Sequence, residues 1–238
     1  MNKTLSQAYK ELLDLSKDKN IPEIEIRMLL CAVNNLSDMS SFYFKKDEEI
    51  IDEEKYNKYA SKLLSGEPIQ YIINEANFVG RDFYVDSDVL IPRMETEEVV
   101  IYAINKANEL FGLNSHVTVL DLCTGSGCIA ITLSYELNAD VFASDIDEKC
   151  LSICRKNAEK HSKNISLLQG DLLKPFLDKE TKFDLLVSNP PYIINKNDID
   201  ERTYKYEPEK ALYPNDIDVV SLYESIIADS KYVMKDKS

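Results

Sequence analysis

The feature that most constrains the fold of this sequence is a regular alternation of short apolar runs and helix-length segments between residues 117 and 188. The apolar runs are residues 117–121, 141–145, 165–169 and 183–188, with helical patterns over residues 126–137 and 148–161. Continuous apolar strands that alternate with helices predict a parallel sheet covered by helices on both faces. Ligands bind such sheets at the carboxyl ends of the strands, near the point where the strand order reverses. We therefore expect the functional site just after Asp121, Asp145, Gln169 and Ser188.

The start of the chain has a different pattern, with apolar residues spaced as in short helices. Asp52 is a predicted N-cap of a helix that ends at Leu64, and Gly66 follows where a glycine commonly ends a helix. We predict a helical domain over residues 1–75, which is either a docking module or a plain structural bundle.

A short alternation over residues 77–85 predicts a β-hairpin. This hairpin belongs to a predicted linker, residues 76–95. A helix is expected to open at Thr96 or Glu95 and to run to about Leu110, with Gly112 ending it, and the α/β domain is predicted over residues 96–238.

The charge balance constrains the partner. Lys and Arg total 28 against 42 Asp and Glu, which gives a net charge of −14. Nucleic-acid-binding proteins neutralise phosphates with a basic face, so we expect no stable nucleic-acid binding. No apolar run reaches the roughly 20 residues of a membrane span, and the first residues lack a signal peptide. We expect a cytoplasmic protein without membrane contact, a monomer by default, whose partner is a protein or a small molecule.

The cysteines and histidines do not predict a metal site or a disulfide framework. No Cys-x-x-Cys pair occurs, and the two histidines have no ligand spacing. The chain's five cysteines are Cys31, Cys123, Cys128, Cys150 and Cys154, and its two histidines are His116 and His161.

The loop after the first strand predicts a nucleotide-type cofactor. Residues 121–127 have the sequence Asp-Leu-Cys-Thr-Gly-Ser-Gly, and glycines let a backbone approach a ligand closely. Residues 125–130 also fit the dinucleotide fingerprint, so NAD stays an alternative at this point. Asp145 ends the second strand and could accept hydrogen bonds from the ribose hydroxyls of NAD or of S-adenosylmethionine. Asp171 could accept from an adenine amine while Leu172 packs on the base.

The sequence Asn189-Pro190-Pro191-Tyr192 after the fourth strand separates these alternatives. The two prolines remove two N–H donors, which leaves the Asn189 side-chain oxygen and the Pro190 carbonyl as acceptors. Tyr192 adds an aromatic plane. Such a site suits a planar NH₂ group, whose two hydrogens need two acceptors, and a dehydrogenase has no use for it.

These motifs together resemble those of class I S-adenosylmethionine-dependent methyltransferases that act on an amide or amine nitrogen. More narrowly, the chain resembles the HemK-type peptide chain release factor glutamine methyltransferases. The segments that carry the resemblance are residues 66–71, 90–93, 95–97 and 189–192, with weaker matches at 207–208 and 211–212.

The resemblance implies an α/β, Rossmann-like methyltransferase domain with a small N-terminal helical domain that grips the substrate. It implies S-adenosylmethionine as cofactor, S-adenosylhomocysteine as product, and class I release factors as the protein substrate. The methylated atom would be the side-chain nitrogen of the glutamine in the Gly-Gly-Gln motif.

The site residues follow from the same resemblance, position by position. The cofactor would be bound by Asp121, Cys123, Thr124, Gly125, Ser126, Gly127, Asp145, Asp171, Leu172 and Asn189, with the loop 123–127 along its methionine part. Asn189 would bridge cofactor and substrate. The substrate clamp would be completed by Pro190, Pro191 and Tyr192, and the catalytic residues would be Asn189, Pro190 and Tyr192.

The chain departs from the family pattern at three places. Cys123 replaces a common glycine, and Met94 replaces the proline that usually follows Ile-Pro-Arg. The family pattern also has further strands after the helix near residues 222–233, so we expect the C-terminal strands to be missing.

Three other functions stay open at this point. An adenine-N(6) nucleic-acid methyltransferase uses a similar Asn-Pro-Pro-Tyr clamp on a flipped base, but the net charge of −14 disfavours it. A glutamine methyltransferase acting on a ribosomal protein would share the same motifs. A non-enzymatic, cofactor-binding regulator would need the glycine loop but not the clamp.

Overall fold

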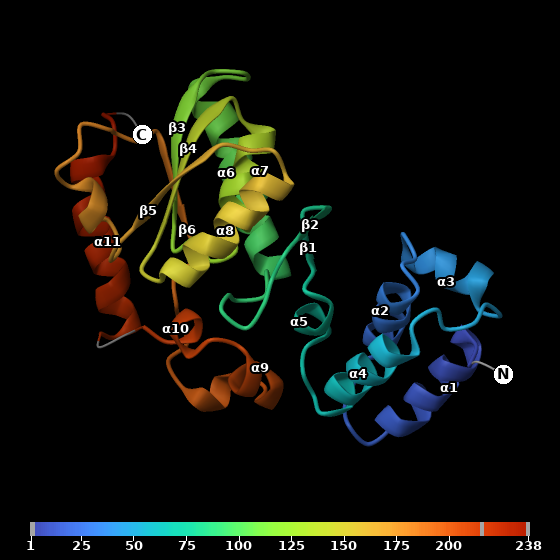
Figure 1. The fold of residues 1–238 in the computed structure, drawn as a ribbon. Helices are drawn as coiled ribbons and strands as arrows, with labels where there is room; N and C mark the ends of the chain where they lie inside the picture. The colour runs from blue at the N-terminus through green and yellow to red at the C-terminus, as the bar shows by residue number, and fades with distance from the viewer. Residues whose placement is uncertain (1–2, 215–216, 237–238) are drawn as a thin grey trace. The chain divides into compact units, whose positions relative to one another are not determined.

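A computed structural model of the chain describes residues 3–214 and 217–236 (Figure 1). The chain divides into two compact units, Met1–Asn74 and Glu75–Ser238, which we call the N-terminal and C-terminal units.

The N-terminal unit is helical. Its helices are α1 (Leu5–Ser16), α2 (Glu23–Val33), α3 (Met39–Lys45), α4 (Glu53–Leu64) and α5 (Ile69–Ile73). Helices this short need tertiary packing, which the fully buried Leu12, Leu29 and Leu63 supply from three of them. The predicted cap of α4 is confirmed, since the Asp52 side chain accepts a hydrogen bond from Lys55 N and Gly66 follows the helix with φ 92°. Helices α3 and α5 were not predicted, because they span too few residues to show a period.

The predicted β-hairpin opens the C-terminal unit. Strands β1 (Ala76–Phe78) and β2 (Arg81–Phe83) pair in antiparallel fashion. The turn places Val79 and Gly80 at positive φ, as a tight hairpin turn requires. Phe78 and Phe83 are fully buried and pack edge to face, which anchors the hairpin.

The centre of this unit is a parallel sheet of β3 (Val117–Leu122), β4 (Ala139–Asp145), β5 (Ile165–Gln169) and β6 (Leu185–Ser188). The strand order is β5-β4-β3-β6, so the order reverses at β3. This arrangement confirms the predicted α/β class. The fourth strand was predicted from residue 183, which is wrong by two residues. Phe183 instead exchanges backbone hydrogen bonds with Val233 and Lys235.

Helices cover both faces of the sheet (Figure 1). One face carries α6 (Met94–Phe111), α7 (Cys128–Glu136) and α8 (Glu148–Lys160), and the other carries α11 (Val219–Val233). Helix α7 begins two residues later than predicted. Gly127 before it has φ 82°, a left-handed conformation that cannot belong to the helix.

The short element η1 (Lys174–Phe176) connects β5 to β6. After β6 the chain forms η2 (Lys196–Asp198), α9 (Glu201–Tyr206) and α10 (Glu209–Leu212) before it reaches α11. The backbone N–H of Ile193 donates to the Leu212 carbonyl at 3.0 Å, so the end of α10 lies beside the chain that leaves β6. No helix in the described parts of the chain is long and apolar enough to cross a bilayer.

Candidate active site

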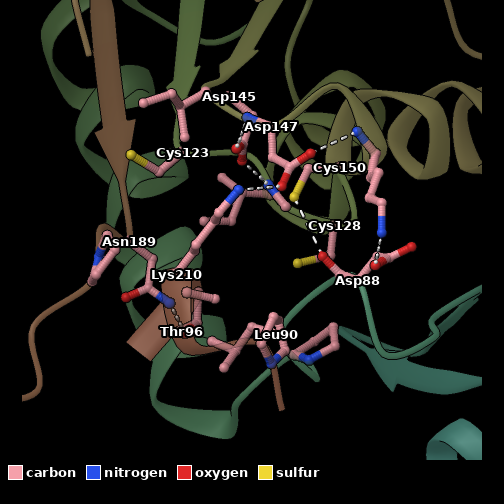
Figure 2. Close-up of a pocket in the computed structure, with 18 of the residues that line it drawn as sticks. Asp88, Leu90, Thr96, Cys123, Cys128, Asp145, Asp147, Cys150, Asn189 and Lys210 are labelled. Atoms are coloured by element: carbon pink, nitrogen blue, oxygen red, sulfur yellow. Dashed lines mark hydrogen bonds and ion pairs between the residues drawn. The ribbon is translucent and has the colours of Figure 1, made fainter. Parts of the chain in front are cut away.

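A cavity of about 600 Å³ lies at the carboxyl ends of the central strands, where the order of the sheet reverses (Figure 2). Its walls come from the loops after β3, β4 and β6, from the segment before α6 and from α10. The lining residues are Asp88, Leu90, Pro92, Arg93, Thr96, Cys123, Gly125, Cys128, Ile129, Asp145, Ile146, Asp147, Lys149, Cys150, Asn189, Pro191, Pro208, Glu209, Lys210 and Ala211.

The glycine loop turns tightly beneath this cavity. Cys123, Gly125 and Gly127 all have positive φ, between 53° and 82°. A Cβ on Gly125 would meet no atom within 4 Å, so the backbone there is open to a ligand. A Cβ on Gly127 would lie 2.5 Å from Cys154 Sγ, so this position requires glycine for packing as well as for φ.

Asp145 lies at the end of β4 with both carboxylate oxygens engaged by the backbone. Oδ2 accepts from Gly125 N at 3.0 Å, and Oδ1 accepts from Asp147 N at 3.1 Å. Burial raises the pKa of this carboxyl group, against the lowering effect of the two N–H donors. Each oxygen keeps a second lone pair, so Asp145 can accept two further hydrogen bonds from a ligand.

Asp121 lies below the glycine loop and does not line the cavity. Its Oδ2 accepts from Thr124 Oγ1 at 2.5 Å and from Ala130 N at 3.0 Å, which joins β3, the loop and α7. Its Oδ1 has no partner among the described residues. Burial raises the pKa of Asp121 to about 7. Thr124 and Ser126, which belong to the loop itself, are likewise buried and lie outside the cavity lining.

Asn157 of α8 is a supporting residue that the sequence did not reveal. It is fully buried, and its Nδ2 donates to the carbonyls of Ser126 at 2.8 Å and Tyr84 at 2.9 Å. Its Oδ1 accepts from Tyr84 N at 2.7 Å. One satisfied amide therefore ties the glycine loop to the chain that leaves the hairpin.

The Asn-Pro-Pro-Tyr loop reaches the cavity with two of its four residues, Asn189 and Pro191. Asn189 Nδ2 donates to Thr96 Oγ1 at 3.2 Å (Figure 2). Pro190 is buried, and Tyr192 is half-exposed and outside the lining. The parts of Pro190 and Tyr192 in a substrate clamp stay predictions.

Asp171 and Leu172, the predicted border of an adenine ring, lie outside the cavity lining. Asp171 pairs with Lys174 at 2.5 Å, and Leu172 packs on the apolar core at the α11 face of the sheet. Ile146, which no motif indicated, lines the cavity directly after Asp145. The adenine assignment also stays a prediction.

Glu207 joins two cavity walls that are far apart in sequence. Its side chain is 2% exposed, and Oε1 accepts from Arg93 Nη2 at 2.5 Å while Oε2 accepts from Ile91 N at 3.2 Å. The weak family match at residues 207–208 was the one signal for it in the sequence. Glu207 links the Ile-Pro-Arg segment to the residues just before α10.

Two ion pairs cross the rim of the cavity (Figure 2). Lys210 of α10 lies 3.2 Å from Asp147, and Lys149 lies 2.7 Å from Asp88. The backbone hydrogen bond from Lys149 and the nearby Lys210 lower the pKa of Asp147. Neither lysine was predicted, since no local pattern marks a pair of residues some 60 positions apart.

Three cysteines line the cavity, and all five in the chain are free. Burial raises the pKa of Cys123 and of Cys128 to about 12, and it also raises that of Cys150. These thiols are therefore neutral near pH 7 and line the cavity as apolar groups. No set of three metal-ligating side chains gathers within residues 3–214 and 217–236.

Comparisons with known proteins give the family. The family model described as "Methyltransferase small domain" matches residues 105–205, and "PrmC N-terminal domain" matches residues 4–73. The release factor glutamine methyltransferase of Bacillus subtilis (strain 168) is 37% identical over 244 residues, which cover 99% of this chain and 83% of that protein. The Staphylococcus aureus (strain NCTC 8325 / PS 47) protein of the same name is 41% identical over 184 residues, covering 76% of this chain and 64% of that protein.

A partial structural likeness accompanies these matches. The ribosomal protein L11 methylase of Lactobacillus delbrueckii subsp. bulgaricus aligns with a TM-score of 0.43 and 20% identity, covering 61% of this chain and 58% of that one. The relatives' identity over most of the chain confirms the resemblance inferred from the motifs. This chain belongs to the release factor glutamine methyltransferase family.

Proposed function

We propose that this protein transfers a methyl group from S-adenosylmethionine to the side-chain amide nitrogen of glutamine in the Gly-Gly-Gln motif of class I peptide chain release factors. The observation that carries this proposal is a single cavity lined by the glycine loop, Asp145 and Asn189. Residues suited to bind the cofactor therefore line the same cavity as the Asn189 carboxamide, which is suited to bind the substrate amide.

The cavity fits S-adenosylmethionine in size and in chemistry. A volume of about 600 Å³ lies within the usual range for small-molecule sites. Asp145 has two free lone pairs for a pair of ribose hydroxyls, and the open face of Gly125 admits a ligand close to the backbone. The carboxylate of Asp145 also lines the cavity and favours a cationic group, whereas Asp88 and Asp147 are each paired with a lysine.

The cofactor supplies a methyl group on a sulfonium centre, and the protein's own residues act on the substrate. An amide nitrogen is a poor nucleophile because its lone pair is delocalised into the carbonyl. Acceptors at Asn189 Oδ1 and the Pro190 carbonyl would bind both N–H hydrogens and stabilise positive charge that grows on the nitrogen. Holding the two reactants in line contributes the remaining acceleration. None of the described residues that line the cavity is a histidine that could act as a general base.

Charge favours a protein substrate over a nucleic acid. The net charge of −14 opposes a phosphate backbone and suits a basic protein. The relatives' printed names give release factor glutamine as their substrate. An adenine-N(6) or ribosomal-protein substrate is therefore not favoured. A cytoplasmic monomer stays the prediction for the compartment and the oligomeric state.

The N-terminal unit is proposed to grip the release factor. It has its own core and leaves Tyr43 and Phe44 of α3 exposed, Phe44 almost completely. A Phe44→Ser variant should raise KM for the release factor severalfold while kcat and cofactor affinity stay near wild type. An unchanged KM in Phe44→Ser would contradict a docking role for α3.

The test of the proposed reaction is intact-mass analysis of a purified class I release factor after incubation with this protein and S-adenosylmethionine. We expect a gain of one methyl group on the intact Gly-Gly-Gln substrate and none on a Gly-Gly-Ala variant. Equal methylation of both substrates, or none on either while the protein binds the cofactor, would contradict the proposal.

A further inference from the structure

The proposed function gives no part to Glu95-Thr96-Glu97, one of the segments that carry the resemblance. Glu97 has a structural partner, since its Oε1 accepts from Val79 N at 3.0 Å and ties α6 to the hairpin turn. Thr96 is different. It is 6% exposed, and it lines the cavity beside Asn189 (Figure 2).

Thr96 meets Asn189 because two elements converge. Thr96 is the third residue of α6, and this helix packs against β6, the strand that leads directly into Asn189. The Asn189 Nδ2 donates to Thr96 Oγ1 at 3.2 Å. Among the described residues this is the one hydrogen bond that the Asn189 carboxamide makes, so its orientation depends on Thr96.

Orientation matters because a carboxamide has an acceptor at one end and donors at the other. The terminal torsion of asparagine is broad, so a carboxamide without a partner rotates freely between the two presentations. The presentation with NH₂ toward the substrate would place donors against the N–H groups of glutamine. Methyl transfer therefore needs the presentation with Oδ1 toward the substrate.

We propose that Thr96 is a positioning residue for methyl transfer, whose hydroxyl accepts from Asn189 Nδ2 and leaves Oδ1 for the substrate amide. This inference rests on the proposed function. Thr96 makes no contact with the reacting atoms in this account. Its hydroxyl positions Asn189, whereas its methyl group contributes only packing.

Two variants separate these roles. Thr96→Val has nearly the same shape but no oxygen, while Thr96→Ser keeps the oxygen and loses the methyl group. The assay is the single-turnover rate of methyl transfer to the release factor with both substrates saturating, and calorimetry gives the cofactor Kd. Melting curves establish that each variant is folded, and Thr96→Ala replaces Thr96→Val if the latter does not fold.

We expect Thr96→Val to slow transfer by about tenfold, as the loss of one orienting hydrogen bond implies. Thr96→Ser should stay within about twofold of wild type, and the cofactor Kd should change less than the transfer rate. A wild-type rate in Thr96→Val would overturn the inference, and so would equal losses in the valine and serine variants. If the wild-type protein itself transfers no methyl group, the proposed function is overturned. This outcome is read from the wild-type protein alone, so it is distinguishable from a failure of the Thr96 inference, which is read from the variants.

Discussion

Replacing Glu207 with leucine should destabilise the C-terminal unit much more than the same change in an exposed ion pair. The variant leaves the buried Ile91 N–H without its acceptor, which costs about 1–3 kcal/mol. It also leaves Arg93 without its partner. Removing one partner of a fully buried pair costs about 3–5 kcal/mol, but Arg93 is 31% exposed and can turn toward water. We therefore expect a total loss of about 2–4 kcal/mol in the free energy of unfolding.

The matched control is Glu136→Leu. Arg81 and Glu136 pair at 2.6 Å, nearly the separation of Arg93 and Glu207, but the Glu136 side chain is 39% exposed. A pair in this environment contributes less than about 1 kcal/mol. Glu207→Gln should fall between the two, since its amide oxygen still accepts from Ile91 N while the negative charge is lost.

The assay is thermal unfolding followed by far-ultraviolet circular dichroism, since the chain has no tryptophan. The two units can unfold in separate transitions, and the transition that rises on addition of S-adenosylmethionine identifies the C-terminal unit. For a unit of this size the loss corresponds to a decrease in Tm of about 5–15 °C. Equal decreases for Glu207→Leu and Glu136→Leu would refute the reasoning that burial of the carboxylate makes this pair important.

Three further predictions concern the support of the glycine loop. Gly127→Ala should lower the free energy of unfolding by about 1–3 kcal/mol, because the new Cβ would meet Cys154 Sγ at a strained φ, and a wild-type urea midpoint would refute this. Native Asp121 has a pKa near 7, above its unfolded value, so it holds its proton longer when folded and stability falls as pH rises from about 4 to 7. Asp121→Asn should reduce the pH-dependent loss in the free energy of unfolding by up to about 1.4 kcal/mol per pH unit. If urea unfolding gives a free-energy difference between variant and wild type that is constant from about pH 4 to 7, the assignment is contradicted. Asn157→Leu should cost about 2–4 kcal/mol, because the buried carbonyl of Ser126 and the partly buried N–H and carbonyl of Tyr84 lose their partner, and a loss below about 0.5 kcal/mol in urea unfolding would argue against it.

The fold of the C-terminal unit was predictable because each strand and helix has a strong local period. β5 matches its predicted range completely, and α8 differs by one residue. Errors occurred where a non-local contact decides the boundary, as at Phe183, which pairs with the chain after α11 rather than with β3. The short elements α9 and α10 have too few residues to show a period.

The candidate site was predictable only in part, for the same physical reason. Asp145 ends one apolar strand and Asn189 follows another, and parallel strands bring their carboxyl ends together. The Glu207 pair with Arg93 and the Asn157 bridge span 114 and 73 residues, so no local pattern indicates them. They become visible only when burial and hydrogen bonding are known.

The central claim is that Asn189 acts on the substrate amide within the cavity that binds the cofactor. The most direct measurement compares Asn189→Ala with wild type in two quantities, the single-turnover rate of methyl transfer and the Kd of S-adenosylmethionine. We predict that transfer is abolished while the Kd changes much less, because the cofactor keeps the glycine loop and Asp145. Equal losses in transfer and in cofactor affinity, or a wild-type rate of transfer, would contradict the account.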